Sequence, residues 1–118
     1  MLRPALLACI ALFFALPAQP EELTLYLANR APHAVAAELS SPDGDRQWPG
    51  GGKVYMLEKG EQKSVRIECR VGETICYGAW RFGDETTAYG VGPDRELVCD
   101  QCCLTCAPAS AAHIDIGG

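Results

Sequence analysis

The chain has 118 residues and a formal charge of −5, from 10 Lys/Arg and 15 Asp/Glu. The two signs of charge are interspersed without a basic stripe, which disfavours nucleic acid and anionic membranes as partners. A chain of this length is expected to form one domain with a modest core, the kind that exported proteins reinforce with disulfides.

Residues 1–18 have the pattern of a secretory signal peptide. One positive charge, Arg3, precedes an apolar run at 5–16, and small and proline residues follow. A bilayer span needs about 20 apolar residues, so this run is too short to anchor the chain. We therefore expect export to the periplasm or the medium, with no stable membrane insertion after cleavage. LLAC at 6–9 also has the form of a lipoprotein signal, but few apolar residues precede Cys9, and we interpret Cys9 as part of the signal.

Residues 22–118 are predicted to form a single all-β domain that is cysteine-rich from 69 to 106. In residues 22–29 three leucines alternate with other side chains, the period of a half-buried strand. Further strands are expected at 34–40, within 48–57 after a glycine-rich loop, at 64–71, 74–82, 86–92 and 112–117. Short strands and frequent turns favour a small disulfide-stabilised β-sandwich or a partly open barrel.

Residues 64–82 fit a β-hairpin with a two-residue turn at 72–73. In this register Cys69 faces Cys76, and one face of the hairpin is apolar. The pairing brings the two cysteines close enough to bridge, although their hydrogen-bonded position is wider than a disulfide prefers. Trp80 lies on the apolar face and is expected in the core.

Six cysteines remain after signal removal, and four of them lie in CDQCCLTC at 99–106. They are Cys69, Cys76, Cys99, Cys102, Cys103 and Cys106. An even number in an exported chain favours a framework of up to three bridges, with 15 possible connectivities. Cys102 and Cys103 are expected to bond to different partners, because a ring between neighbouring cysteines is strained. One candidate set pairs Cys69 or Cys76 with the cluster at 99–106, but the sequence does not choose the connectivity.

The cysteine cluster has two other interpretations, as a metal site and as a redox dithiol. Cys₄ zinc sites normally separate two CxxC halves by about 15–20 residues, whereas here the two halves are contiguous. A redox CxxC needs a neighbouring cation or helix N-terminus, and this cluster contains Asp100 instead. We assign no metal site and no cofactor, and keep a thiol-based zinc- or copper-binding envelope protein as the alternative.

The sequence contains no evident catalytic set, so the chain is predicted to be a binding or structural module and not an enzyme. His33 and His113 lie 80 residues apart, and no serine has a nucleophile-elbow context. GGGK at 50–53 lacks the spacing of a phosphate loop. Trp48 and Tyr77 are the candidates for a surface that binds an unidentified protein or glycan. A hydrolase that uses unassigned Glu and Asp residues is the rival from another class.

Three segments carry a resemblance: ICYGAW at 75–80, YGVG at 89–92 and CDQCCLTC at 99–106. With WPGGGKVYMLEKGE before them, they resemble a group of small exported bacterial proteins. The resemblance spans residues 48–106 and implies a secreted, cysteine-bridged domain without implying an activity. More loosely, LTLYLANRAPHAV and LEKGEQKSVRI are similar to the opening strands of thaumatin-like β-sandwiches, which implies a sheet layout only.

Overall fold

The computed structural model describes residues 20–43 and 45–118, so the signal-peptide and Cys9 predictions lie outside the described residues. Within these ranges the chain forms strands and two 3-10 turns, and none of its helices is long and apolar enough to cross a membrane. The strands are β1 (Pro20–Asn29), β2 (Val35–Ser41), β3 (Arg46–Trp48), β4 (Tyr55–Leu57), β5 (Gln62–Arg70), β6 (Thr74–Arg81), β7 (Asp84–Gly90), β8 (Cys103–Thr105) and β9 (Ala111–Ile116). The turns are η1 (Pro93–Arg95) and η2 (Asp100–Cys102).

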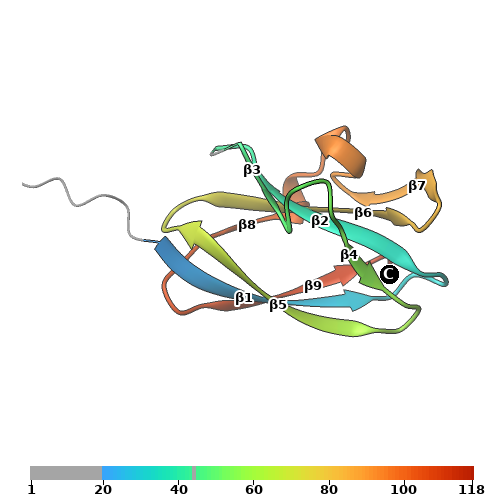
Figure 1. Ribbon diagram of the computed structural model, residues 1–118, viewed down its shortest axis with the longest axis horizontal. Helices are drawn as coiled ribbons and strands as arrows, with labels where there is room; N and C mark the ends of the chain where they lie inside the picture. The colour runs from blue at the N-terminus through green and yellow to red at the C-terminus, as the bar shows by residue number, and fades with distance from the viewer. Residues whose placement is uncertain (1–19, 44) are drawn as a thin grey trace, which may run out of the picture.

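Two sheets pack face to face, which confirms the predicted small β-sandwich (Figure 1). The smaller sheet has the order β5-β1-β9, with β1 antiparallel to β5 and parallel to β9. The larger sheet has the order β3-β2-β6-β7, and β4 and β8 extend it by pairing with β2 and β6. The strand expected within 48–57 after a glycine-rich loop is β4, and the loop connects it to β3, which also pairs with β2.

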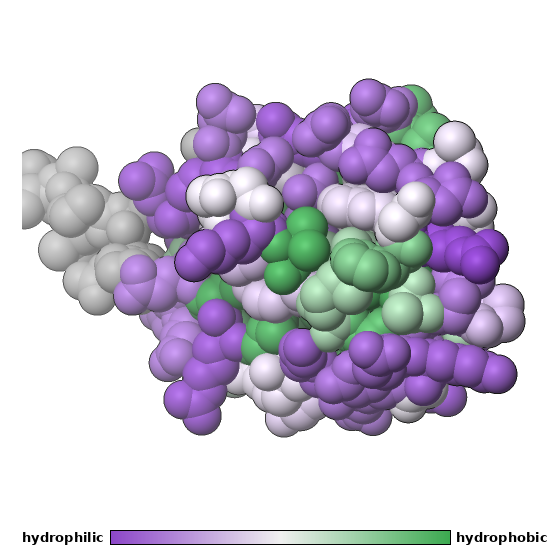
Figure 2. Space-filling model, turned by 45° about the vertical axis from the view of Figure 1, so that its right-hand side comes forward, coloured by the Kyte–Doolittle hydropathy of each residue, from purple (hydrophilic) through white to green (hydrophobic). Residues whose placement is uncertain are grey.

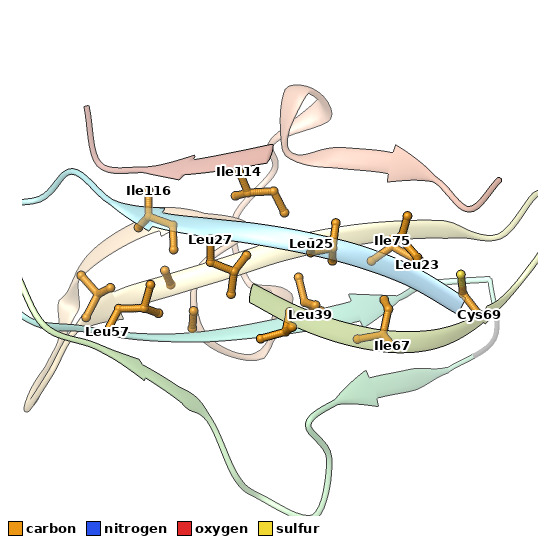
Figure 3. Packing of buried hydrophobic residues seen from close by; sticks show 14 of the residues in the cluster. Leu23, Leu25, Leu27, Leu39, Leu57, Ile67, Cys69, Ile75, Ile114 and Ile116 are labelled. Carbon is orange, nitrogen blue, oxygen red and sulfur yellow. The ribbon is translucent and has the colours of Figure 1, made fainter. Parts of the chain in front are cut away.

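The core lies between the sheets and is built from the alternating apolar positions that the sequence shows. The three leucines of β1 point inward, as predicted, and each is at most 1% exposed. Aliphatic side chains from both sheets meet them, as Figure 3 shows. The largest contributors are Leu23, Leu25, Leu27, Leu39, Leu57, Ile67, Ile75, Ile114 and Ile116. Each such burial stabilises the fold by about 1.5–3 kcal/mol before chain entropy is subtracted.

The predicted hairpin at 64–82 is wrong, because β5 and β6 belong to different sheets. β5 pairs with β1, β6 pairs with β2, and the turn after Arg70 carries the chain from one sheet to the other. On β6 the core position is Ala79, which is fully buried. Trp80 points away from the core and is half-buried, so its predicted place in the core is also wrong.

Three disulfides link the six described cysteines in pairs, as the framework hypothesis predicts. Cys69–Cys106 ties the smaller sheet to the segment after β8, and Cys76–Cys103 joins β6 to β8. Cys99–Cys102 closes a local loop with a sequence separation of 3. The neighbours at 102 and 103 bond to different partners, as expected. Cys69 and Cys76 both bond to the cluster, and the Cys69–Cys76 bridge that the predicted hairpin would allow does not form.

A buried asparagine fixes the end of β1. The Asn29 side-chain amide donates to the carbonyl oxygens of His33, Leu57 and Glu58, at 2.9–3.2 Å. Its side-chain oxygen accepts a hydrogen bond from the Ala31 N–H at 2.9 Å. A buried amide is tolerated when its donors and acceptor are paired, so this side chain holds β1 against β4 and the turn before β2.

Hydrophilic side chains cover most of the outside of the sandwich. Figure 2 shows one face, on which an apolar area is ringed by hydrophilic side chains. In the described part of the chain the large apolar residues that are well exposed are Val71, Phe82, Leu97 and Val98. Leu97 and Val98 follow η1, at 47% and 94% exposed, and Val98 directly precedes Cys99.

Candidate binding site

The outer face of the larger sheet carries a hollow of about 180 Å³. Its floor includes Glu38 of β2 and Trp80 of β6, because the alternate positions on these strands face the core. Trp48 lines one side with the β3–β4 loop, and Asp94 of η1 lines another. Figure 1 shows this loop and the segment after β7 above the same sheet. Both tryptophans of the chain contribute to its lining. Trp80 lies on the outer face of the sheet, whereas Trp48 lies opposite Leu39 and also packs against the core.

Two glycines allow the segment before η1 to lie directly on β6. A Cβ at Gly78 would come within 2.2 Å of the Gly92 carbonyl oxygen, closer than any real contact. The Val91 N–H donates to the Tyr77 carbonyl oxygen at 3.0 Å across the same approach. Close backbone approach of this kind requires glycine, and here it sets Asp94 beside the floor of the hollow.

We expect Gly78→Ala to destabilise the fold by about 2–3 kcal/mol, because the added methyl group overlaps backbone that cannot move alone. Gly83→Ala is the matched control, since its Cβ would meet no atom and only its positive φ of 84° is strained. That strain should cost about 1 kcal/mol. Urea unfolding monitored by tryptophan fluorescence measures both, and equal losses would contradict the close approach at Gly78.

Negative charge dominates the hollow. Its lining has three acidic side chains, Glu38, Glu85 and Asp94, and one lysine, Lys53. None of these four residues takes part in the described ion pairs. Burial raises the pKa of Glu38, and the charges of Asp94 and Glu85 add to this rise. A hydrogen bond from the Asp94 N–H to Glu38 Oε1, 3.1 Å long, and the charge of Arg95 oppose it. The Glu38 carboxylate is therefore partly desolvated among like charges, where a cation would stabilise it.

Tyr77, the other predicted ligand residue, lines a second hollow of about 260 Å³ between β8 and β9. His113 and Asp115 lie on its β9 side. Burial raises the pKa of the Tyr77 hydroxyl, and the charge of Asp115 adds to that shift, so the phenol stays neutral. Trp48 and Tyr77 thus line separate hollows and do not form one surface.

The two histidines occupy different places and neither completes a catalytic set in the described residues. His33 Nε2 lies 3.0 Å from the Tyr89 hydroxyl, whereas His113 stacks on Tyr26 with ring centroids 4.9 Å apart. Among residues 20–43 and 45–118, no group of three or more His, Cys, Asp or Glu side chains is arranged to hold a metal ion. The described cysteines are all engaged in disulfides.

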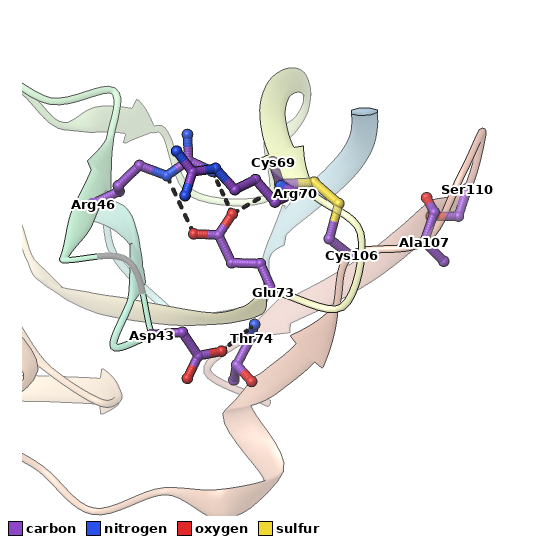
Figure 4. Close-up of a disulfide and its surroundings, with 9 residues drawn as sticks. All are labelled: Asp43, Arg46, Cys69, Arg70, Glu73, Thr74, Cys106, Ala107 and Ser110. Atoms are coloured by element: carbon purple, nitrogen blue, oxygen red, sulfur yellow. Dashed lines mark hydrogen bonds and ion pairs between the residues drawn. A yellow bond between two sulfur atoms is a disulfide. The ribbon is translucent and has the colours of Figure 1, made fainter. Parts of the chain in front are cut away.

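A buried ion pair lies beside the Cys69–Cys106 bridge and is structural (Figure 4). The Glu73 carboxylate, 5% exposed, accepts hydrogen bonds from the Arg46 guanidinium and the Arg70 N–H. Burial opposes its ionisation, but these bonds and one from Ser41 outweigh burial and lower the pKa of Glu73 to about 2. The backbone of Glu73 also accepts from the Cys106 N–H at 2.8 Å. This residue therefore connects β3, the β5–β6 turn and the segment after β8.

Comparisons with protein-family models, curated proteins and solved structures found no match. A β-sandwich hosts many unrelated functions, so the fold itself selects none. The features that bear on function are the charges, aromatic side chains and shape of the hollow around Trp48 and Trp80.

Proposed function

We propose that the protein is an exported binding module of the cell envelope or the secretome, and that the hollow around Trp48 and Trp80 is its ligand site. Three disulfides in so short a chain are typical of oxidising compartments outside the cytosol. The signal-peptide pattern of residues 1–18 supports the same location. Both point to the periplasm or the extracellular medium.

The observation that carries the proposal is a concave site on the outer face of the larger sheet, in which Trp80 lies among charged side chains and to which Trp48 also contributes. Trp48 comes from β3 and Trp80 from β6, and charged groups surround them. Binding sites are typically concave and combine aromatic surface with a few placed polar groups, and tryptophan is enriched among residues that dominate binding energy. The cross-linked sheet holds these side chains rigidly, which lowers the entropic cost of binding.

We expect Trp48→Ala to abolish binding of the mature protein to the ligand that it selects from a glycan array and a peptide array. Loss of one central aromatic contact costs about 2 kcal/mol or more, which is a loss of about 30-fold or more in affinity. Phe82→Ala is the matched control, because Phe82 is an exposed aromatic residue outside the lining of the hollow. Binding that survives Trp48→Ala and Trp80→Ala but is lost in Tyr77→Ala would place the ligand site in the other hollow.

The thiol-based metal-binding alternative requires free thiolates, which the three bridges do not leave. Mass spectrometry of the exported protein distinguishes the two. The binding-module proposal expects a mass about 6 Da below that of the reduced mature chain, since each bridge removes two hydrogen atoms. Free thiols with a bound ion that a chelator removes would favour the alternative.

A further inference from the structure

The hollow around Trp48 and Trp80 has a charge that restricts its ligand. Its three carboxylates come from three elements, with Glu38 on β2, Glu85 on β7 and Asp94 on η1. Of the three, Glu38 is on the most central strand of the sheet. The one described hydrogen bond to its Oε1 comes from the backbone N–H of Asp94. The opposing ammonium group, that of Lys53, is on the exposed β3–β4 loop and makes no described ion pair. The site therefore has an excess of negative charge inside an aromatic lining.

The spacing of these groups favours an organic cation over a metal ion. In the described part of the chain no three acidic side chains come close enough to share one metal ion. Indole rings attract ammonium and guanidinium groups with about 0.5–2 kcal/mol, depending on desolvation. Within the protein itself the Arg46 guanidinium lies over the Trp48 ring, 5.1 Å from its centroid. One face of Trp48 is thus already covered, and Trp48 also packs against the core, so Trp80 is the aromatic surface left for a ligand.

The size of the hollow favours one side chain of a larger partner over a free small molecule. At about 180 Å³ it is smaller than the roughly 300–1,000 Å³ of sites that enclose small-molecule ligands. Leu97 and Val98, within four positions of Asp94 in the chain, are exposed apolar residues. Exposed apolar side chains next to a polar site are typical of surfaces that contact another protein.

We propose that this hollow receives a lysine or arginine side chain from an extended segment of a partner protein. The proposal rests on the proposed function, because it names the ligand class of the same site. The aliphatic part of the side chain lies against Trp80, and its cationic head lies among Glu38, Glu85 and Asp94. Charge complementarity selects basic partners, in agreement with the net charge of −5 of the chain.

The test is a titration of the mature, disulfide-bonded protein with short peptides, followed by tryptophan fluorescence. The probes are Ac-Gly-Gly-Lys-Gly-Gly-NH₂, its arginine counterpart, and the same lysine peptide acetylated at Nζ. We expect saturable changes with the two basic peptides and about tenfold weaker affinity for the acetylated one, since acetylation removes the charge. Equal affinity for the lysine peptide and its acetylated form, or no response to either, overturns the proposal.

Glu38→Gln isolates the charge at the site with little change of shape. We expect about fivefold to tenfold weaker binding of the lysine peptide, with an unchanged unfolding midpoint. Glu68→Gln makes the same charge change on an exposed position of β5, in the other sheet, and should leave binding unchanged. Equal losses in the two variants would show a non-specific effect of net charge and overturn the assignment. Glu85→Gln replaces Glu38→Gln if the latter fails to fold.

The two proposals fail separately. If the protein binds a glycan on the array in a way that depends on Trp48, and does not respond to basic peptides, the binding-module proposal stands and the basic-partner proposal fails. If array binding and peptide binding both survive Trp48→Ala and Trp80→Ala, the assignment of this hollow as the ligand site is wrong.

Discussion

Removal of the Cys69–Cys106 bridge by the double substitution Cys69→Ala, Cys106→Ala should lower the free energy of unfolding by about 3 kcal/mol. The bridge spans a sequence separation of 37 and connects the smaller sheet to the segment after β8. Because Cys76–Cys103 lies within this interval and stays closed, the removed bridge restricts a loop of about 10 residues in the unfolded chain. Urea unfolding of the purified variant at neutral pH measures the loss, which is a large part of the about 5–15 kcal/mol typical of a whole domain.

The local bridge Cys99–Cys102 gives the matched control, because it closes a separation of only 3. The double substitution Cys99→Ala, Cys102→Ala should cost about 1.5 kcal/mol by the same loop-entropy argument. The difference of about 1–1.5 kcal/mol between the two variants is the quantity that matters. Equal losses would contradict the larger loop assigned to Cys69–Cys106.

Acidification should destabilise the protein through Glu73, with a loss of about 2–3 kcal/mol. The pKa of Glu73 is about 2 in the folded state, against an ordinary value of 4.5. The unfolded chain therefore takes up this proton first, so the contribution is fully present above about pH 5 and is lost as the pH falls toward 2. Chemical unfolding at intervals between pH 7 and pH 2 measures this dependence.

Glu73→Gln tests whether that residue is responsible. The variant should be less stable than the wild type at pH 7, because Arg46 loses its buried partner. The slope of its stability below pH 5 should also be smaller. Asp84→Asn is the control: hydrogen bonds from Thr86 lower the pKa of Asp84, but these bonds are exposed, at the start of β7. An unchanged acid slope in Glu73→Gln would assign the effect to other carboxylates.

The strands were predictable because burial on one face leaves a period of two in the sequence. The leucines of β1 and the isoleucines at 114 and 116 of β9 are clear cases, and both strands form where that pattern predicts. Alternation determines which side chains share a face, but it does not determine the neighbouring strand. Residues 64–82 satisfy the pattern of a hairpin and also that of two strands in opposite sheets.

The outer face of β6 explains why that ambiguity gave the wrong answer. Cys76 and Gly78 are buried, although they point away from the main core, because the segment of η1 and η2 covers them. A strand buried on both faces loses the contrast between apolar and polar positions on which the prediction depends. The sequence pattern therefore assigns the apolar residues of this face to the main core, whereas they belong to a second, smaller apolar cluster.

The candidate site was only partly accessible from sequence. The sequence indicates Trp48 as a candidate for the ligand surface, but it places Trp80 in the core. Glu38 and Asp94 belong to no local sequence motif that would indicate a site. These residues come together because β2 pairs with β6 in a register that sets Ala36 opposite Trp80. The Gly78–Gly92 approach then brings η1 over the sheet. Both features are long-range, and no short stretch of sequence encodes them.

The most direct test of the binding-module account is an NMR titration of the mature protein with the ligand that gives the strongest array signal. The chain has two tryptophans, so its spectrum contains two indole N–H signals that report on the hollow without interference. The account predicts that both signals shift in a saturable manner while the backbone signals of His113 and Asp115, at the other hollow, stay unchanged. Unmoved indole signals at saturating ligand would contradict it.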